Sequence, residues 1–111
     1  MSTQADLPEA VALYIKSADE HNTDALVSSL TEDAVVDDEG RVHQGKDDIR
    51  AWNKNSVAKF ACRYEVTDVA TYGDETVTTI TVSGNFSRSP VSLFYRFIVS
   101  DGKVAQLRIH S

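Results

Sequence analysis

Residues Thr31–Arg50 read TEDAVVDDEGRVHQGKDDIR, and this stretch decides the fold. Residues 34–38 are a short run rich in β-branched side chains, and Glu39-Gly40 is a turn signal before a second extended piece over residues 41–44. Gly45 then ends the extended chain. The pattern predicts two short strands joined by a turn.

A helix is predicted directly after this hairpin. Asp47 and Asp48 stand where a first helical turn favours negative charge, and Ile49 with Trp52 begins an apolar face at a spacing of three residues. We expect this helix to span about residues 46–59.

Two further helices are predicted before the hairpin. Val11, Tyr14, Ile15 and Ala18 follow the spacing of one buried helical face, which places the first helix at about residues 8–21. We expect the His21-Asn22 pair to end it, with Asn22 tolerating a left-handed conformation. Thr23 is the expected N-cap of a short second helix.

After residue 61 the pattern becomes extended. Four strands are predicted at about residues 62–72, 76–86, 91–100 and 104–110, with polar and glycine-containing turns between them. The third strand, VSLFYRFIVS, is apolar on both faces apart from Arg96, so we expect a central strand covered on both sides. Helices first and an antiparallel sheet after them is the order of an α+β fold.

Composition and charge limit the function classes. The 111 residues carry 41% hydrophobic and 25% charged side chains, which predicts one domain over residues 1–111 and no membrane span. A net charge of −6 disfavours nucleic acid as a partner. The N-terminus shows no secretory signal pattern and Cys62 is the single cysteine, so we expect a cytoplasmic protein.

The order of these elements resembles the NTF2-like superfamily, in its SnoaL-like and ketosteroid-isomerase-like branch. The resemblance rests on Tyr14-Ile15 in the first helix, Asp24-Ala25-Leu26 in the second, residues 31–34 leading to Asp38, and Gly45–Ile49 opening the third. It implies a cone in which three N-terminal helices pack on a strongly curved mixed or antiparallel sheet. The superfamily hosts many activities, so the fold alone does not name one.

The resemblance also implies a catalytic pair. Asp38 falls at the position of the branch's catalytic base, and Tyr14 at that of its oxyanion-hole tyrosine. Because side chains alternate along a strand, Asp37 cannot enter the same pocket as Asp38. The branch's second oxyanion acid falls here at about Phe94, which donates no hydrogen bond. Tyr95 or His110 is therefore expected to assist Tyr14 in stabilising the oxyanion.

Trp52, Phe94, Tyr95 and His110 are the predicted pocket-lining residues, with a core or interface position as the alternative for Trp52. The three histidines lie far apart with no metal-ligand spacing, so neither a metal nor another cofactor is predicted.

Two hypotheses for function remain open. The first is an isomerase- or cyclase-type enzyme on a small apolar carbonyl ligand, with Asp38 as general base and Tyr14 as oxyanion donor. The second is a non-catalytic binding or association module of the same fold. In either case the strand over residues 91–99 needs cover on its outer face, which predicts a homodimer.

Overall fold

The hairpin predicted from residues 34–44 is present in the computed structural model, which describes residues 7–111. Strand β1 (Leu30–Asp38) pairs antiparallel with β2 (Arg41–Gln44), and helix α3 (Lys46–Phe60) follows directly. The turn residues Glu39 and Gly40 have φ of 51° and 93°. Positive φ at both positions suits the twist of a two-residue hairpin. The predicted turn is therefore confirmed.

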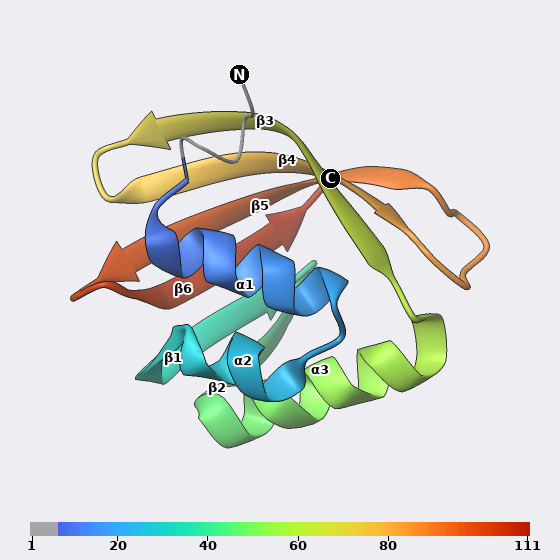
Figure 1. Cartoon of the computed structure of the whole chain (residues 1–111), viewed down its shortest axis with the longest axis horizontal. Coiled ribbons are helices and arrows are strands. Elements are labelled where there is room, and N and C mark those ends of the chain that lie inside the picture. The colour runs from blue at the N-terminus through green and yellow to red at the C-terminus, as the bar shows by residue number, and fades with distance from the viewer. Residues whose placement is uncertain (1–6) are drawn as a thin grey trace.

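The described residues form one six-stranded sheet in the order β2-β1-β6-β5-β4-β3. Its remaining strands are β3 (Arg63–Tyr72), β4 (Glu75–Ser83), β5 (Val91–Ser100) and β6 (Lys103–His110). Strands β1 and β6 pair in parallel, and the other neighbours pair antiparallel. The sheet is strongly curled without closing (Figure 1). This confirms the predicted α+β cone with a mixed sheet.

The helices lie against the concave face of the sheet (Figure 1). Helix α1 (Glu9–Asp19) contacts β3, β5 and β6, α2 (Thr23–Ser28) contacts α1 and α3, and α3 contacts β1 and β2. Between residues 7 and 111, no helix has both the length and the apolar character that a membrane crossing requires.

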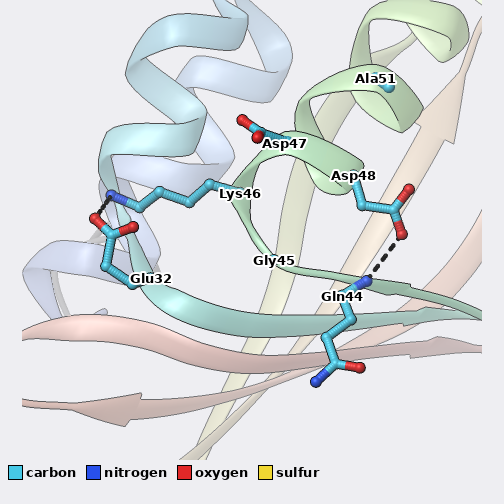
Figure 2. Close-up of a pocket in the computed structure, with 7 residues that line it drawn as sticks. All are labelled: Glu32, Gln44, Gly45, Lys46, Asp47, Asp48 and Ala51. Atoms are coloured by element: carbon cyan, nitrogen blue, oxygen red, sulfur yellow. Dashed lines mark hydrogen bonds and ion pairs between the residues drawn. The ribbon is translucent and has the colours of Figure 1, made fainter.

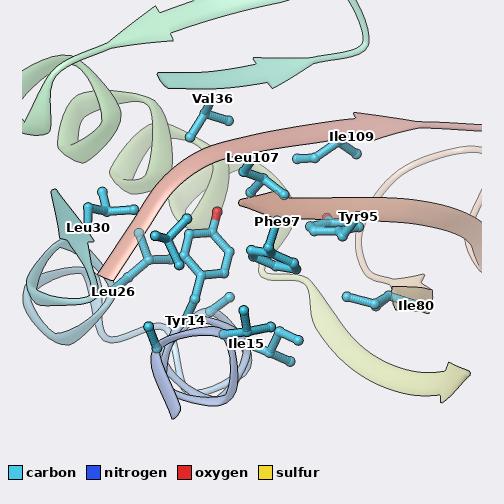
Figure 3. Close-up of a cluster of buried hydrophobic side chains, with 14 of the residues drawn as sticks. Tyr14, Ile15, Leu26, Leu30, Val36, Ile80, Tyr95, Phe97, Leu107 and Ile109 are labelled. Atoms are coloured by element: carbon cyan, nitrogen blue, oxygen red, sulfur yellow. The ribbon is translucent and has the colours of Figure 1, made fainter. Parts of the chain in front are cut away.

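The core lies between α1 and the concave face, as Figure 3 shows. Tyr14 and Ile15 reach it from α1, and inward-facing residues of the strands meet them. Buried side chains of the cluster include Tyr14, Leu26, Leu30, Val36, Ile80, Tyr95, Phe97, Leu107 and Ile109. Removing one such aliphatic side chain typically costs about 2–5 kcal/mol.

The outer face of the sheet differs from what the sequence predicts for β5. This strand is interior, but the described helices cover only its concave side, where Leu93, Tyr95 and Phe97 are buried. On the other side Phe94 remains 40% exposed, beside Arg96. The expected cover on both faces is therefore not provided by residues 7–111.

The connection between α1 and α2 also corrects two expectations. His21, not Asn22, takes the left-handed conformation, with φ of 59°. Asn22, not Thr23, caps α2, because its Oδ1 accepts a hydrogen bond from the Ala25 amide at 3.1 Å. Thr23 lies inside the helix, and its hydroxyl donates to Asn53 Oδ1 at 2.7 Å, which ties α2 to α3.

Candidate functional site

A partly open cavity of about 130 Å³ lies between the two long helices and the concave face of the sheet. We call it the Asp38 cavity. Helices α1 and α3 supply one side, and strands β1, β3, β4, β5 and β6 supply the other. Its lining residues are Tyr14, Ala18, Asp38, Trp52, Asn53, Ser56, Phe60, Cys62, Tyr64, Val82, Leu93, Tyr95 and Ile109.

Asp38 is the carboxylate of this cavity. It is the last residue of β1 and shares the inward face with Val36. Asp37 lies on the outward face, where its Oδ1 accepts a hydrogen bond from the Gly40 amide at 2.8 Å. Strand alternation thus separates the two neighbouring acids.

Trp52 fixes the orientation of Asp38. Its indole Nε1 donates a hydrogen bond to Asp38 Oδ2 at 3.2 Å, so the tryptophan both lines the cavity and contacts the acid. His43 supports the indole of Trp52. Its ring stacks on the indole, with centroids 5.4 Å apart and an interplanar angle of 27°. His43 Nε2 is buried and has no hydrogen-bond partner among the residues that the structure describes.

Tyr14 reaches the cavity from α1 and is only 2% exposed. Its ring meets Phe97 edge-on, with centroids 5.4 Å apart, and its hydroxyl points away from α1 toward the sheet (Figure 3). Burial raises the pKa of Tyr14 well above the ordinary value, and the nearby Tyr64 and Asp38 raise it further. The phenol therefore stays protonated and can donate a hydrogen bond.

Two more tyrosines line the same cavity. Tyr95 comes from β5, and its pKa is raised by burial and then by Tyr64, Tyr14 and Asp38. Tyr64 comes from β3, and its pKa is raised by burial and by the adjacent Cys62. The three phenols and the Asp38 carboxylate thus line one cavity. Such an arrangement offers one base and several neutral hydrogen-bond donors.

The structure brings four of the six predicted site residues together at this cavity: Asp38, Tyr14, Trp52 and Tyr95. Phe94 and His110, which the sequence places at the pocket, instead lie on the outer sheet face. Phe94 pairs with His110 across β5 and β6, and their ring centroids are 5.4 Å apart. Because successive strand residues face opposite ways, an inward Tyr95 requires an outward Phe94.

His110 is engaged on that outer face. Its Nε2 accepts a hydrogen bond from Arg96 Nε at 2.9 Å, and its Nδ1 lies 3.1 Å from the Ser111 carbonyl oxygen. It is thus separated from Asp38 by the sheet.

Sequence reasoning did not assign Tyr64, Cys62, Asn53 or Ser56 to the pocket. For Tyr64 a signal existed: it shares a face of β3 with the buried Val66, and alternation from Val66 turns it inward.

A second hollow of about 660 Å³ is wider and open to solvent at the start of α3 (Figure 2). Polar groups of this hollow pair with one another. Lys46 Nζ lies 3.4 Å from Glu32 Oε1, and the backbone N–H of Gln44 donates a hydrogen bond to Asp48 Oδ2 at 3.1 Å. Among residues 7–111, no group of three or more histidine, cysteine or acidic side chains is arranged to hold a metal ion. We therefore take the Asp38 cavity as the candidate site.

Comparisons with known proteins give the chain a family context. The SnoaL-like domain family matches residues 11–107. A Sinorhizobium meliloti protein called a polyketide cyclase is 36% identical, with a TM-score of 0.94 and coverage of 98% of this chain and 100% of the other. No curated protein matches the sequence significantly.

More distant structures share the fold. A Catenulispora acidiphila protein with a ketosteroid isomerase-like fold, in complex with trimethylamine, is 16% identical with a TM-score of 0.82, covering 94% of this chain and 85% of the other. A computationally designed 17-OHP binder is 14% identical with a TM-score of 0.80, covering 92% and 87%. At these identities the likeness extends to the fold alone.

Proposed function

This chain belongs to the SnoaL-like domain family, and on that premise we propose that it is an isomerase- or cyclase-type enzyme that moves a proton on an apolar carbonyl compound. One observation carries the proposal: the Asp38 carboxylate and the Tyr14 phenol line the same cavity, whose other walls are largely apolar. Burial of lining residues such as Tyr14 and Tyr95 lowers the local polarity and strengthens hydrogen bonds and charge interactions beside them.

Asp38 is the proposed general base. Its Oδ2 accepts a hydrogen bond from Trp52 Nε1, and Oδ1, which no side chain of residues 7–111 contacts by a hydrogen bond, is the oxygen proposed to take a proton from the carbon beside the carbonyl. The electrons of the broken C–H bond move to the carbonyl oxygen and form an enolate. The protonated Asp38 then returns the proton to the same carbon or to a conjugated one, so the carboxylate is regenerated.

Tyr14 is the proposed donor to the enolate oxygen. Its phenol remains protonated because burial raises its pKa, so it can donate throughout the neutral range. Tyr95 is the proposed second donor. It faces the cavity from β5, next to the outward Phe94, and so takes the place expected for the missing acid.

The name of the Sinorhizobium meliloti relative supports a cyclase as one form of this chemistry. An enolate that attacks a second carbonyl closes a ring, and its formation begins with the same proton abstraction. Isomerisation and cyclisation would therefore share Asp38 and the phenols and differ in the ligand.

Solvent exchange tests the proposal. Neutral ketones are incubated with the protein in D₂O, and loss of the protons beside the carbonyl is followed by NMR. We expect wild-type protein to exchange at least one ketone, and Asp38→Asn to slow it by about 10²–10⁴-fold. Asp37→Asn is the matched control, because Asp37 lies on the outward face, and it should keep the wild-type rate. Equal rates in the two variants would exclude Asp38 as the base.

The outer face of the sheet favours association as a second role. Val42 is 60% exposed and Phe94 40% exposed, and they lie on strands whose outward sides the helices leave uncovered. We propose that two copies pair through this face. Analytical ultracentrifugation should show a dimer that Phe94→Glu dissociates; a monomer in wild type would contradict the pairing.

A further inference from the structure

We propose that the substrate is a neutral carbonyl compound about the size of one six-membered ring, bound with its oxygen at the phenols of Tyr14 and Tyr95. The inference rests on the proposed function and defines its substrate class. Three features of the Asp38 cavity lead to it: its volume, the fixed rim at the end of α3, and the charge of its lining.

The volume sets the size. A cavity of about 130 Å³ is close to the roughly 150 Å³ apolar cavity that holds benzene. Pockets for drug-sized molecules are larger, typically about 300–1,000 Å³. A fused two-ring ketone therefore requires the walls to move or part of the ligand to stay outside the cavity, and a four-ring steroid requires more of either.

The rim at the end of α3 resists such movement. Phe60 lines the cavity there, and its backbone carbonyl oxygen accepts a hydrogen bond from the backbone N–H of Asn85 at 2.8 Å. Its ring meets Phe86 edge-on, with centroids 6.2 Å apart. Gly84 adds to the close packing, because a Cβ built on it would lie 2.7 Å from the same carbonyl oxygen. The loop between β4 and β5 thus holds Phe60 against the cavity.

The charge of the lining indicates that the ligand is neutral. The described residues that line the cavity include no lysine, arginine or histidine. Asp38 supplies the carboxylate among them. A carboxylate or phosphate on the ligand would lose its hydration without gaining a cationic partner, and Asp38 would repel it. Neutral phenols suit a carbonyl oxygen, which accepts hydrogen bonds without carrying a charge before reaction.

A ligand series tests size and charge in the wild-type protein. Exchange of the protons beside the carbonyl is measured in D₂O for cyclohexanone, its fused two-ring homologue decalone, a four-ring ketosteroid, and oxocyclohexanecarboxylate. We expect kcat/KM for cyclohexanone to exceed that for decalone by about 10-fold or more, as is usual for extra carbons that an apolar pocket does not accommodate. The carboxylate should react at least as poorly as decalone.

The Phe60→Ala variant tests in the same assay whether the Phe60 ring limits the size of the ligand. Removing this ring opens the rim, so the preference for cyclohexanone over decalone should fall several-fold while exchange still requires Asp38. The wild-type series is informative even if this variant folds poorly.

The outcomes separate the two claims. Faster Asp38-dependent exchange of decalone, the steroid or the carboxylate by wild type would overturn the size or charge inference and leave the proposed function standing. Absence of Asp38-dependent exchange for all four compounds would overturn the proposed function, and this inference with it.

Discussion

Replacing Tyr14 by phenylalanine should separate catalysis from stability. The ring stays, so the edge-on contact with Phe97 at 5.4 Å is retained. Within residues 7–111 no side chain depends on the lost hydroxyl for a hydrogen bond, and it is not a buried polar atom that lacks a partner. We therefore expect the free energy of unfolding to change by less than about 1 kcal/mol, whereas Tyr14→Ala should cost about 3–5 kcal/mol.

The effect on activity should be much larger. Losing one donor to a developing oxyanion typically lowers kcat by about 10²–10³-fold, which corresponds to about 2.7–4 kcal/mol of transition-state stabilisation. The assay pairs urea unfolding with ketone proton exchange on the same preparations. A variant that loses more than about 2 kcal/mol of stability yet keeps wild-type exchange would show that the phenol is structural, and the reasoning would fail.

Three other predictions concern stability. The Arg63 guanidinium, which donates to Asp19 at 2.8 and 3.0 Å, lowers the pKa of Asp19. Asp19→Asn should therefore cost on the order of 1 kcal/mol near neutral pH, and the difference should vanish in urea melts as the pH falls below about 4; a constant difference would contradict the linkage. Burial raises the pKa of Tyr14, Tyr64 and Tyr95, so the stability they confer is complete below about pH 10 and is lost as the pH rises above it. The phenolate absorbance of these three residues should appear together with the loss of circular dichroism. Ionisation of these residues while the protein remains folded would contradict the prediction. Gly84→Ala places a Cβ 2.7 Å from the Phe60 carbonyl oxygen and should cost about 1–3 kcal/mol in chemical unfolding, while Ser83→Ala should change little.

The fold follows from periodicity and turn chemistry, which are local properties of the chain. The strand over residues 91–100 and the hairpin strand over residues 41–44 match the structure, because their ends coincide with turn residues. Strand β1 begins earlier than predicted, at Leu30, since its first part pairs with Val104 of β6. That parallel pairing joins distant segments, and no local pattern indicates it.

The candidate site was harder to predict because it depends on which way single side chains point. Phe94 and Tyr95 are both predicted to line the pocket, but neighbouring residues of a strand face opposite sides, so only one of them can line it. Arg96 carried the correcting signal, since a charged residue marks the outward face that it shares with Phe94. The hydrogen bond from Trp52 to Asp38 depends on the rotation of α3 against β1, which sequence spacing does not fix.

A crystal structure of the protein with cyclohexanone would show whether a small ketone binds between Asp38 and Tyr14. We expect the ketone inside the Asp38 cavity, with its oxygen about 2.7–3.1 Å from the Tyr14 hydroxyl and the adjacent carbon facing the Asp38 carboxylate. An empty cavity at saturating ketone, or a ketone bound only on the outer sheet face near Phe94, would contradict this expectation.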